Sequence, residues 1–133
     1  MLRTSRCVWV FAVAIAAITL VAHAHASLKH ASPYAGAVLA ASPQELQLEF
    51  GSAVQLDRVE VSLTGEGGYP IDLIEPAADA RTGQSAVVRR VLARPVQSGT
   101  YHVFWRVLSA DGHFTRGDYS FEVRFQSPAV REH

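Results

Sequence analysis

Sulfur is almost absent from this sequence, whose 133 residues include one cysteine, Cys7, and one methionine, Met1. Both lie near the start of the chain, so a domain that begins after them can form no disulfide. Such a domain also offers no thiolate to a metal ion. We therefore expect a domain that its hydrophobic core alone holds together, in which any metal ion is bound through nitrogen and oxygen.

An excess of charge of either sign is also missing, because 12 Lys and Arg residues balance 12 Asp and Glu residues. Arg3 and Arg6 precede residue 25, so 12 minus 2 leaves 10 basic residues against 12 acidic ones in the rest of the chain. This remainder lacks the basic face that nucleic-acid binding requires and the polybasic patch that an anionic membrane surface attracts. We expect no nucleic-acid partner.

The first two dozen residues have the pattern of a secretory signal peptide. Arg3 and Arg6 form a positively charged start, residues 7–22 are almost entirely apolar, and small residues follow them. The apolar run is shorter than the roughly 20 residues that cross a bilayer, and no charged stop-transfer cluster follows it. We predict a signal peptide over residues 1–24, export to the periplasm, and no membrane span in the mature protein.

Two peptide bonds fit the small-residue pattern of signal cleavage. A cut after Ala24 makes His25 the first residue of the mature protein, where the free α-amine and the imidazole form a ready chelate. A cut after Ala26 leaves Ser27 first and removes that chelate. The cleavage pattern by itself leaves both bonds open.

The remainder of the chain has the pattern of an antiparallel β protein. Apolar and polar residues alternate, as in strands with one solvated face, over residues 46–50, 59–63 and 119–125. Turns rich in Gly and Pro separate these runs from further expected strands over residues 69–74, 85–91 and 100–107. About seven short strands without an amphipathic helix predict an all-β fold, an immunoglobulin-like Greek-key β-sandwich.

This β-sandwich domain is expected to span residues 25–126, and a flexible tail over residues 127–133 to follow it. Its central strand is predicted over residues 100–107, because β-branched and aromatic residues occupy both faces of that run. Trp105 is expected to be a core anchor and His102 to lie at the sheet surface.

The strand that contains Trp105 leads into a pattern specific to one family. The pattern is Gly-x-Tyr-x-Val-x-Trp-Arg, then Ser-x-Asp-Gly-His, then a Gly and Phe-x-Val, at Gly99, Tyr101, Val103, Trp105, Arg106, Ser109, Asp111, Gly112, His113, Gly117, Phe121 and Val123. Earlier in the chain, a His, a Leu three residues on, a Ser-Pro turn and a Gly stand at His25, Leu28, Ser32, Pro33 and Gly36. Together these residues resemble the CopC family of exported copper-binding proteins, across essentially the whole mature domain.

The resemblance implies a single Cu(II) site with His25, Asp111 and His113 as ligands. An N-terminal His supplies its amine and its Nδ1, and the other two residues add a carboxylate oxygen and a second imidazole. Three nitrogens and one oxygen suit tetragonal Cu(II), and Zn(II) is the weaker competitor. Asp111 and His113 are two residues apart, so their side chains emerge on the same side of an extended segment.

Three further residues are candidates for supporting contacts around the copper ion. His30 is five residues from the new terminus and is expected to give a hydrogen bond instead of coordinating. Ser52 stands about where some family members have a Glu. Arg106 is a candidate to pair with a carboxylate near the site, and a solvated charge at a strand end is the alternative. No methionine-rich Cu(I) site is expected, because Met1 is the only methionine.

The sequence thus indicates a periplasmic Cu(II)-binding protein that sequesters or delivers copper in homeostasis or resistance and is not an enzyme. The resemblance also implies a CopD-like inner-membrane copper transporter as a partner, and we expect the protein to be a monomer. Two alternatives remain. A copper-dependent polysaccharide monooxygenase also uses an N-terminal His, but it needs an open coordination position, which Asp111 would fill. A metal-free immunoglobulin-like interaction module would hold no copper at these residues.

Mass spectrometry of the mature protein purified from the periplasm tests the cleavage bond. We expect His25 to be the first residue, because only this cut retains the chelate that the Asp-Gly-His motif would complete. A mature chain that starts at Ser27 contradicts this prediction.

Overall fold

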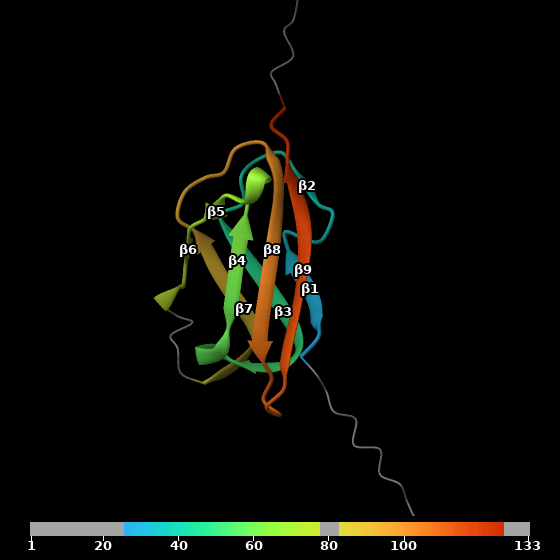
Figure 1. Cartoon of the computed structure of the whole chain (residues 1–133), viewed down its shortest axis with the longest axis vertical. Helices are drawn as coiled ribbons and strands as arrows, with labels where there is room; N and C mark the ends of the chain where they lie inside the picture. The colour runs from blue at the N-terminus through green and yellow to red at the C-terminus, as the bar shows by residue number, and fades with distance from the viewer. Residues whose placement is uncertain (1–25, 78–82, 127–133) are drawn as a thin grey trace, which may run out of the picture.

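The computed structural model describes residues 26–77 and 83–126, which form two β-sheets packed as a sandwich (Figure 1). The expected signal peptide, His25 and the expected C-terminal tail lie outside the described residues. One sheet has the strand order β1-β3-β7-β6, and the other has the order β2-β9-β8-β4-β5. The prediction of an all-β, immunoglobulin-like sandwich is confirmed.

The described part of the chain forms nine strands, three of which have only two residues. The four-stranded sheet contains β1 (Leu28–Ser32), β3 (Glu45–Gln55), β6 (Leu73–Ile74) and β7 (Gln84–Leu92). The five-stranded sheet contains β2 (Val38–Leu39), β4 (Glu60–Thr64), β5 (Pro70–Ile71), β8 (Gly99–Leu108) and β9 (Phe114–Val123). Two 3-10 turns, η1 (Leu56–Arg58) and η2 (Glu66–Gly68), flank β4. No helix among these residues has the length and apolar character needed to span a bilayer.

Residues 69–74, expected to be one strand, form two strands in different sheets. β5 pairs with β4, whereas β6 pairs with β7 in the opposite sheet. Asp72 lies between them, and its carbonyl oxygen accepts a hydrogen bond of 3.0 Å from the backbone N–H of Ala93. The expectation of one continuous strand is wrong here, because the chain crosses between the sheets at Asp72.

β8 is the central strand that the sequence predicts, since β9 and β4 pair with its two edges. Its side chains alternate strictly, with Val103, Trp105 and Val107 buried between the sheets and His102 and Phe104 exposed on the outer face. Trp105 is only 6% exposed, which confirms its role as a core anchor. β8 and β9 pair in continuous register over all ten residues of each strand.

The core between the sheets consists of two clusters, one toward each end of the sandwich. The first contains Ala37, Leu46, Leu63, Leu92, Val96, Tyr101, Val103, Phe121 and Val123. The second, which we call the Trp105 cluster, contains Ala26, Leu48, Phe50, Val54, Val88, Trp105 and Val107. In it, the rings of Phe50 and Trp105 meet edge to face with their centroids 5.2 Å apart. The Trp105 cluster lies toward the end where β8 stops and β9 begins.

Gly117 on β9 lies directly opposite Trp105 in the β8–β9 register. A Cβ atom at Gly117 would lie 2.5 Å from Cζ2 of the Trp105 ring, which is closer than carbon atoms approach without a bond. The indole therefore packs onto a strand position that has room only for glycine.

We expect Gly117→Ala to lower the free energy of unfolding by about 1–3 kcal/mol, because the buried indole must move to admit the methyl group. Urea denaturation followed by Trp105 fluorescence measures the change. Gly51→Ala is the matched control, since its new Cβ would come closer than 3.0 Å only to Cε of the flexible Lys29 side chain, which can move aside, and its effect should be smaller. Equal stability of the two variants would contradict this account of the packing.

Candidate metal centre

The loop that joins β8 to β9 is a tight turn closed by backbone hydrogen bonds. The N–H of Ser109 donates to the carbonyl oxygen of His113 over 2.9 Å, and the N–H of Gly112 donates to the carbonyl oxygen of Ser109 over 3.0 Å. Gly112 has φ of 88°, a left-handed conformation that favours glycine. The Asp-Gly dipeptide thus forms the turn, and the backbone fixes the positions of the residues on both sides of it.

This turn brings the side chains of Asp111 and His113 together. Oδ2 of Asp111 lies 3.3 Å from Nδ1 of His113, and the two side chains are 31% and 55% exposed. A carboxylate and an imidazole at this distance are oxygen and nitrogen donors of the kind that borderline divalent metals bind. The pair is therefore open to an ion arriving from solvent.

Hydrogen bonds favour the ionised form of Asp111. Its Oδ1 accepts a hydrogen bond from the hydroxyl of Ser109 and another, of 3.2 Å, from the backbone N–H of His113. The Ser109 hydroxyl is the largest cause that lowers the pKa of the Asp111 carboxyl, partial desolvation opposes it, and the His113 N–H adds to the lowering. Asp111 is accordingly an anionic oxygen donor at neutral pH.

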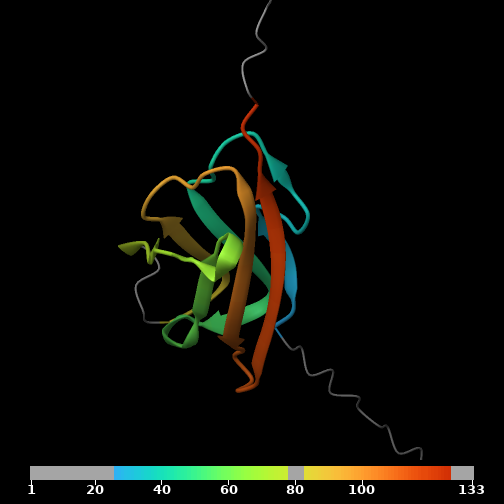
Figure 2. The same cartoon turned by 45° about the horizontal axis from the view of Figure 1, so that its top comes forward.

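The start of the described chain is held next to this turn. Ala26 is completely buried in the Trp105 cluster, and the hydroxyl of Thr115 donates to its carbonyl oxygen over 3.1 Å. Thr115 is two residues after His113. Figure 2 shows the start of β1 beside the start of β9 at the end of the sandwich where the β8–β9 turn lies.

An irregular stretch of β3 connects the chain start with the turn. The pairing of β3 with β7 shifts register between Glu49 and Val54. Within this stretch, the N–H of Gly51 donates to the carbonyl oxygen of Ser27 over 2.8 Å, and the carbonyl oxygen of Ala53 accepts from the N–H of Ala110 over 3.1 Å. Irregularities of this kind redirect a strand and are frequent beside functional sites. Here the redirected backbone binds both segments that surround the candidate site.

The three residues expected to support the site lie on three different strands. His30 is exposed on β1, opposite Glu49 of β3. Ser52 is half-buried within the irregular stretch of β3. Arg106 on β8 pairs with the carboxylate of Glu60 on β4, with its Nη1 3.2 Å from Oε1 of Glu60. Its guanidinium carbon also lies 3.9 Å from the centre of the Phe114 ring.

Sequence reasoning assigned no role at the site to two residues that the structure places there, Ser109 and Thr115. Ser109 is 1% exposed and contacts Asp111, and its position two residues before an Asp was the available signal for such a contact. No sequence pattern indicated a role for Thr115, since its partner Ala26 is 89 positions away in the chain.

The described residues do not complete a metal site by themselves. Within residues 26–77 and 83–126, no group of three or more His, Cys, Asp or Glu side chains is placed to hold an ion. Asp111 and His113 form a pair of such donors at the turn. The chemistry of the pair fits Cu(II), which binds imidazole and carboxylate donors well.

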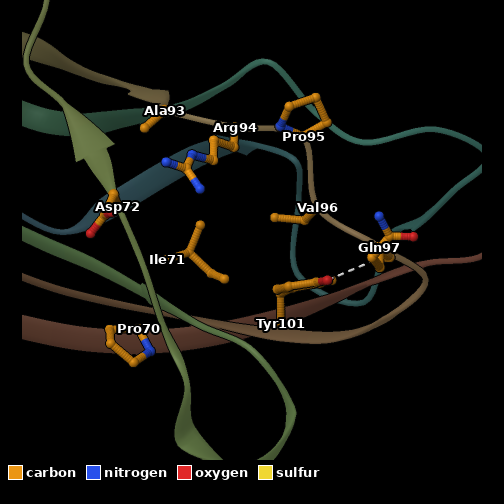
Figure 3. Close-up of a pocket in the computed structure, with 9 residues that line it drawn as sticks. All are labelled: Pro70, Ile71, Asp72, Ala93, Arg94, Pro95, Val96, Gln97 and Tyr101. Atoms are coloured by element: carbon orange, nitrogen blue, oxygen red, sulfur yellow. Dashed lines mark hydrogen bonds between the residues drawn. The ribbon is translucent and has the colours of Figure 1, made fainter.

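A pocket of about 350 Å³ lies at the opposite end of the sandwich (Figure 3). Ile71, Val96 and Tyr101 line it, and the hydroxyl of Tyr101 donates to the carbonyl oxygen of Gln97 over 2.6 Å. Asp72 is the only carboxylate among its lining residues, which include no His. This pocket therefore lacks the donors that a copper site needs.

An immunoglobulin-like β-sandwich with a carboxylate–imidazole pair on the turn between its last two strands is the class of protein that the fold and the site define. The family model described as "CopC domain" matches residues 28–124, and the chain belongs to this family. The family consists of copper-binding resistance proteins and not of enzymes, so the expectation of a non-enzyme is confirmed.

Known proteins similar to this chain include one sequence relative and two solved structures. "Protein YobA" of Escherichia coli strain K12 is 35% identical over 101 residues, which are 76% of this chain and 80% of YobA. The crystal structure of CopC from Methylosinus trichosporium OB3b matches with a TM-score of 0.65 and 30% identity, over 80% of this chain and 100% of that one. PcoC, a "Methionine Rich Copper Resistance Protein" from Escherichia coli, matches with a TM-score of 0.66 and 30% identity, over 76% and 100% of the two chains.

We expect Thr115→Val to loosen the start of β1, because Val keeps the shape of Thr but cannot donate to the carbonyl oxygen of Ala26. Loss of one such hydrogen bond costs about 1 kcal/mol, and amide hydrogen exchange of the peptide that contains residues 26–32 should become faster. Thr64→Val on β4 makes the same chemical change away from the chain start and should leave that exchange unaltered. Unchanged exchange in Thr115→Val would contradict the role of this contact.

Proposed function

We propose that this CopC family member is a periplasmic protein that binds one Cu(II) ion through the α-amine and imidazole of His25, the carboxylate of Asp111 and the imidazole of His113. In this role it sequesters copper or delivers it to a partner such as a CopD-like inner-membrane transporter. The proposal includes removal of residues 1–24, because only a free α-amine at His25 completes the chelate.

The observation that carries this proposal is the hydrogen bond between Thr115 and Ala26. His25 is bonded directly to Ala26, and consecutive Cα atoms are about 3.8 Å apart. The carbonyl of Ala26 is held by a residue only two positions beyond His113. This contact supports a site in which the first residue of the mature chain and the Asp-Gly-His turn share one ion.

The donor set also favours copper over other divalent ions. Two imidazoles, one amine and one carboxylate give three nitrogens and one oxygen, and among the first-row divalent metals Cu(II) binds such donors most tightly. Hydrogen bonds keep Asp111 anionic, so that it can contribute charge as well as an oxygen. The similarity of this chain to PcoC, a copper resistance protein, agrees with this choice of metal.

The alternatives with other chemistry receive less support. A polysaccharide monooxygenase needs a coordination position for oxygen, and membership of a family of non-enzymes argues against that activity. A metal-free interaction module gives no reason for the carboxylate–imidazole pair beside the buried chain start. Single-site binding of Cu(II) without a Cu(I) site agrees with a sequence whose only methionine is Met1.

Copper titration of the mature protein that begins at His25, with electron paramagnetic resonance, tests the ligand set. We expect one Cu(II) per chain and a spectrum typical of nitrogen-rich tetragonal copper. His113→Ala should weaken binding by more than the roughly 10- to 100-fold that follows loss of an outer-shell partner, because a direct ligand is removed.

His102→Ala is the matched control for this substitution, since His102 is exposed on the outer face of β8 away from the turn. It should retain the wild-type affinity and spectrum. If His113→Ala binds copper as the wild type does, the assignment of the turn as the metal site is wrong. A version with one additional alanine before His25 should also lose affinity, because the chelating amine becomes an amide.

A further inference from the structure

Ser109 is a buried polar residue next to the two candidate ligands of the turn. It follows directly after β8 and is only 1% exposed. Its backbone is fixed on both sides, because its N–H donates to His113 and it forms an isolated bridge with Val54 of β3. A side chain on such a rigid segment has little freedom to move.

The hydroxyl of Ser109 points into the turn instead of into the core. Its Oγ lies within hydrogen-bond distance of Oδ1 of Asp111 and 3.0 Å from the carbonyl oxygen of His113. A hydroxyl has one hydrogen, so it donates to one of these acceptors at a time. The carboxylate is the stronger acceptor, because hydrogen bonds to ionised groups are shorter and stronger than neutral ones.

The two carboxylate oxygens of Asp111 have different contacts. Oδ1 accepts from the Ser109 hydroxyl and from the backbone N–H of His113. Oδ2 is the oxygen that lies 3.3 Å from Nδ1 of the His113 ring. The hydrogen bonds therefore fix the carboxylate with Oδ2 on the side of the imidazole.

A partly exposed aspartate would otherwise rotate among several conformers, and binding a metal would require one of them to be selected. Fixing the carboxylate before the metal arrives removes that entropic cost. It also disfavours rotation of Oδ1 toward the ion, because such a rotation breaks two hydrogen bonds and leaves the buried Ser109 hydroxyl without its stronger acceptor.

We propose that Ser109 is a positioning residue of the copper site, which holds Oδ1 of Asp111 so that the carboxylate coordinates the ion through Oδ2 alone. This inference rests on the proposed function, since it assumes that Asp111 is a ligand. It adds a residue that does not touch the metal but sets how one ligand is presented to it.

A double-mutant cycle tests whether Ser109 acts through Asp111. Ser109→Ala should weaken Cu(II) binding by about 10- to 100-fold, the usual effect of losing an outer-shell partner of a ligand, and should change the hyperfine splitting of the copper spectrum. In an Asp111→Ala background the same substitution should change neither. An equal loss in both backgrounds would show that Ser109 acts on the fold alone and would overturn the proposal.

Asp111→Asn gives a second test that leaves Ser109 intact. With the Ser109 hydroxyl and the His113 N–H both donating, the amide oxygen should occupy the place of Oδ1, and the NH2 group, which cannot coordinate, should replace Oδ2. We therefore expect Asp111→Asn to bind copper no better than Asp111→Ala. If Asn retains much of the wild-type affinity, the side chain rotates freely and the proposal is wrong.

Two further variants complete the design. Ser98→Ala removes a hydroxyl that accepts from the backbone N–H of Phe125 at the far end of β8, and it should bind copper like the wild type. His113→Ala, measured in parallel, separates the two hypotheses. Normal binding by His113→Ala refutes the proposed site itself, whereas weak binding by His113→Ala with normal binding by Ser109→Ala refutes only the role of Ser109.

Discussion

The irregular stretch of β3 between Glu49 and Val54 is the constraint on which the candidate site depends. There β3 departs from its register with β7, and its backbone groups contact Ser27 and residues 109–110 instead. The hydrogen bonds from Gly51 to Ser27 and from Ala110 to Ala53 both depend on this departure from regular pairing. The Trp105 cluster lies beneath this stretch and is closed on one side by the glycine opposite the indole. Packing and backbone pairing thus both hold the start of the described chain next to the β8–β9 turn.

The sequence predicted the fold best in strands whose alternate side chains face the core. Alternation predicted strands over residues 46–50, 59–63 and 119–125, which overlap β3, β4 and β9, although β3 ends and β9 begins five residues beyond these bounds. The aromatic and β-branched content of residues 100–107 correctly placed β8 centrally. The prediction of one strand over residues 69–74 failed, because the chain changes sheets at Asp72 without a break in the pattern of apolar residues. The sequence also could not reveal contacts such as Thr115 with Ala26, which depend on tertiary packing between residues 89 positions apart. Asp111 and His113 were predicted from the Asp-Gly-His pattern that resembles the CopC family, and the structure brings their side chains together because they share a turn.

The scarcity of sulfur distinguishes this chain from the relative whose structure is described as methionine-rich. Both chains share the sandwich, so the fold does not itself determine which donor atoms are available at its surface. In this chain the donors near the β8–β9 turn are nitrogen and oxygen, and the pocket at the far end is lined by apolar side chains together with Asp72, Arg94 and Gln97. The donor atoms that this chain offers at its surface are therefore set by its loops and not by the shared sandwich.

The contact between residues 26 and 115 has a topological consequence. An ion shared by the mature N-terminus and the β8–β9 turn would close a loop that contains almost the whole domain, so the ion would bind far more weakly to an unfolded chain. In the proposed site, ligands from residue 25 and from the β8–β9 turn would meet only after β1 has paired with β3 and β9 with β8. If the protein is exported unfolded and binds copper at this site, it would therefore bind the ion only after it has folded.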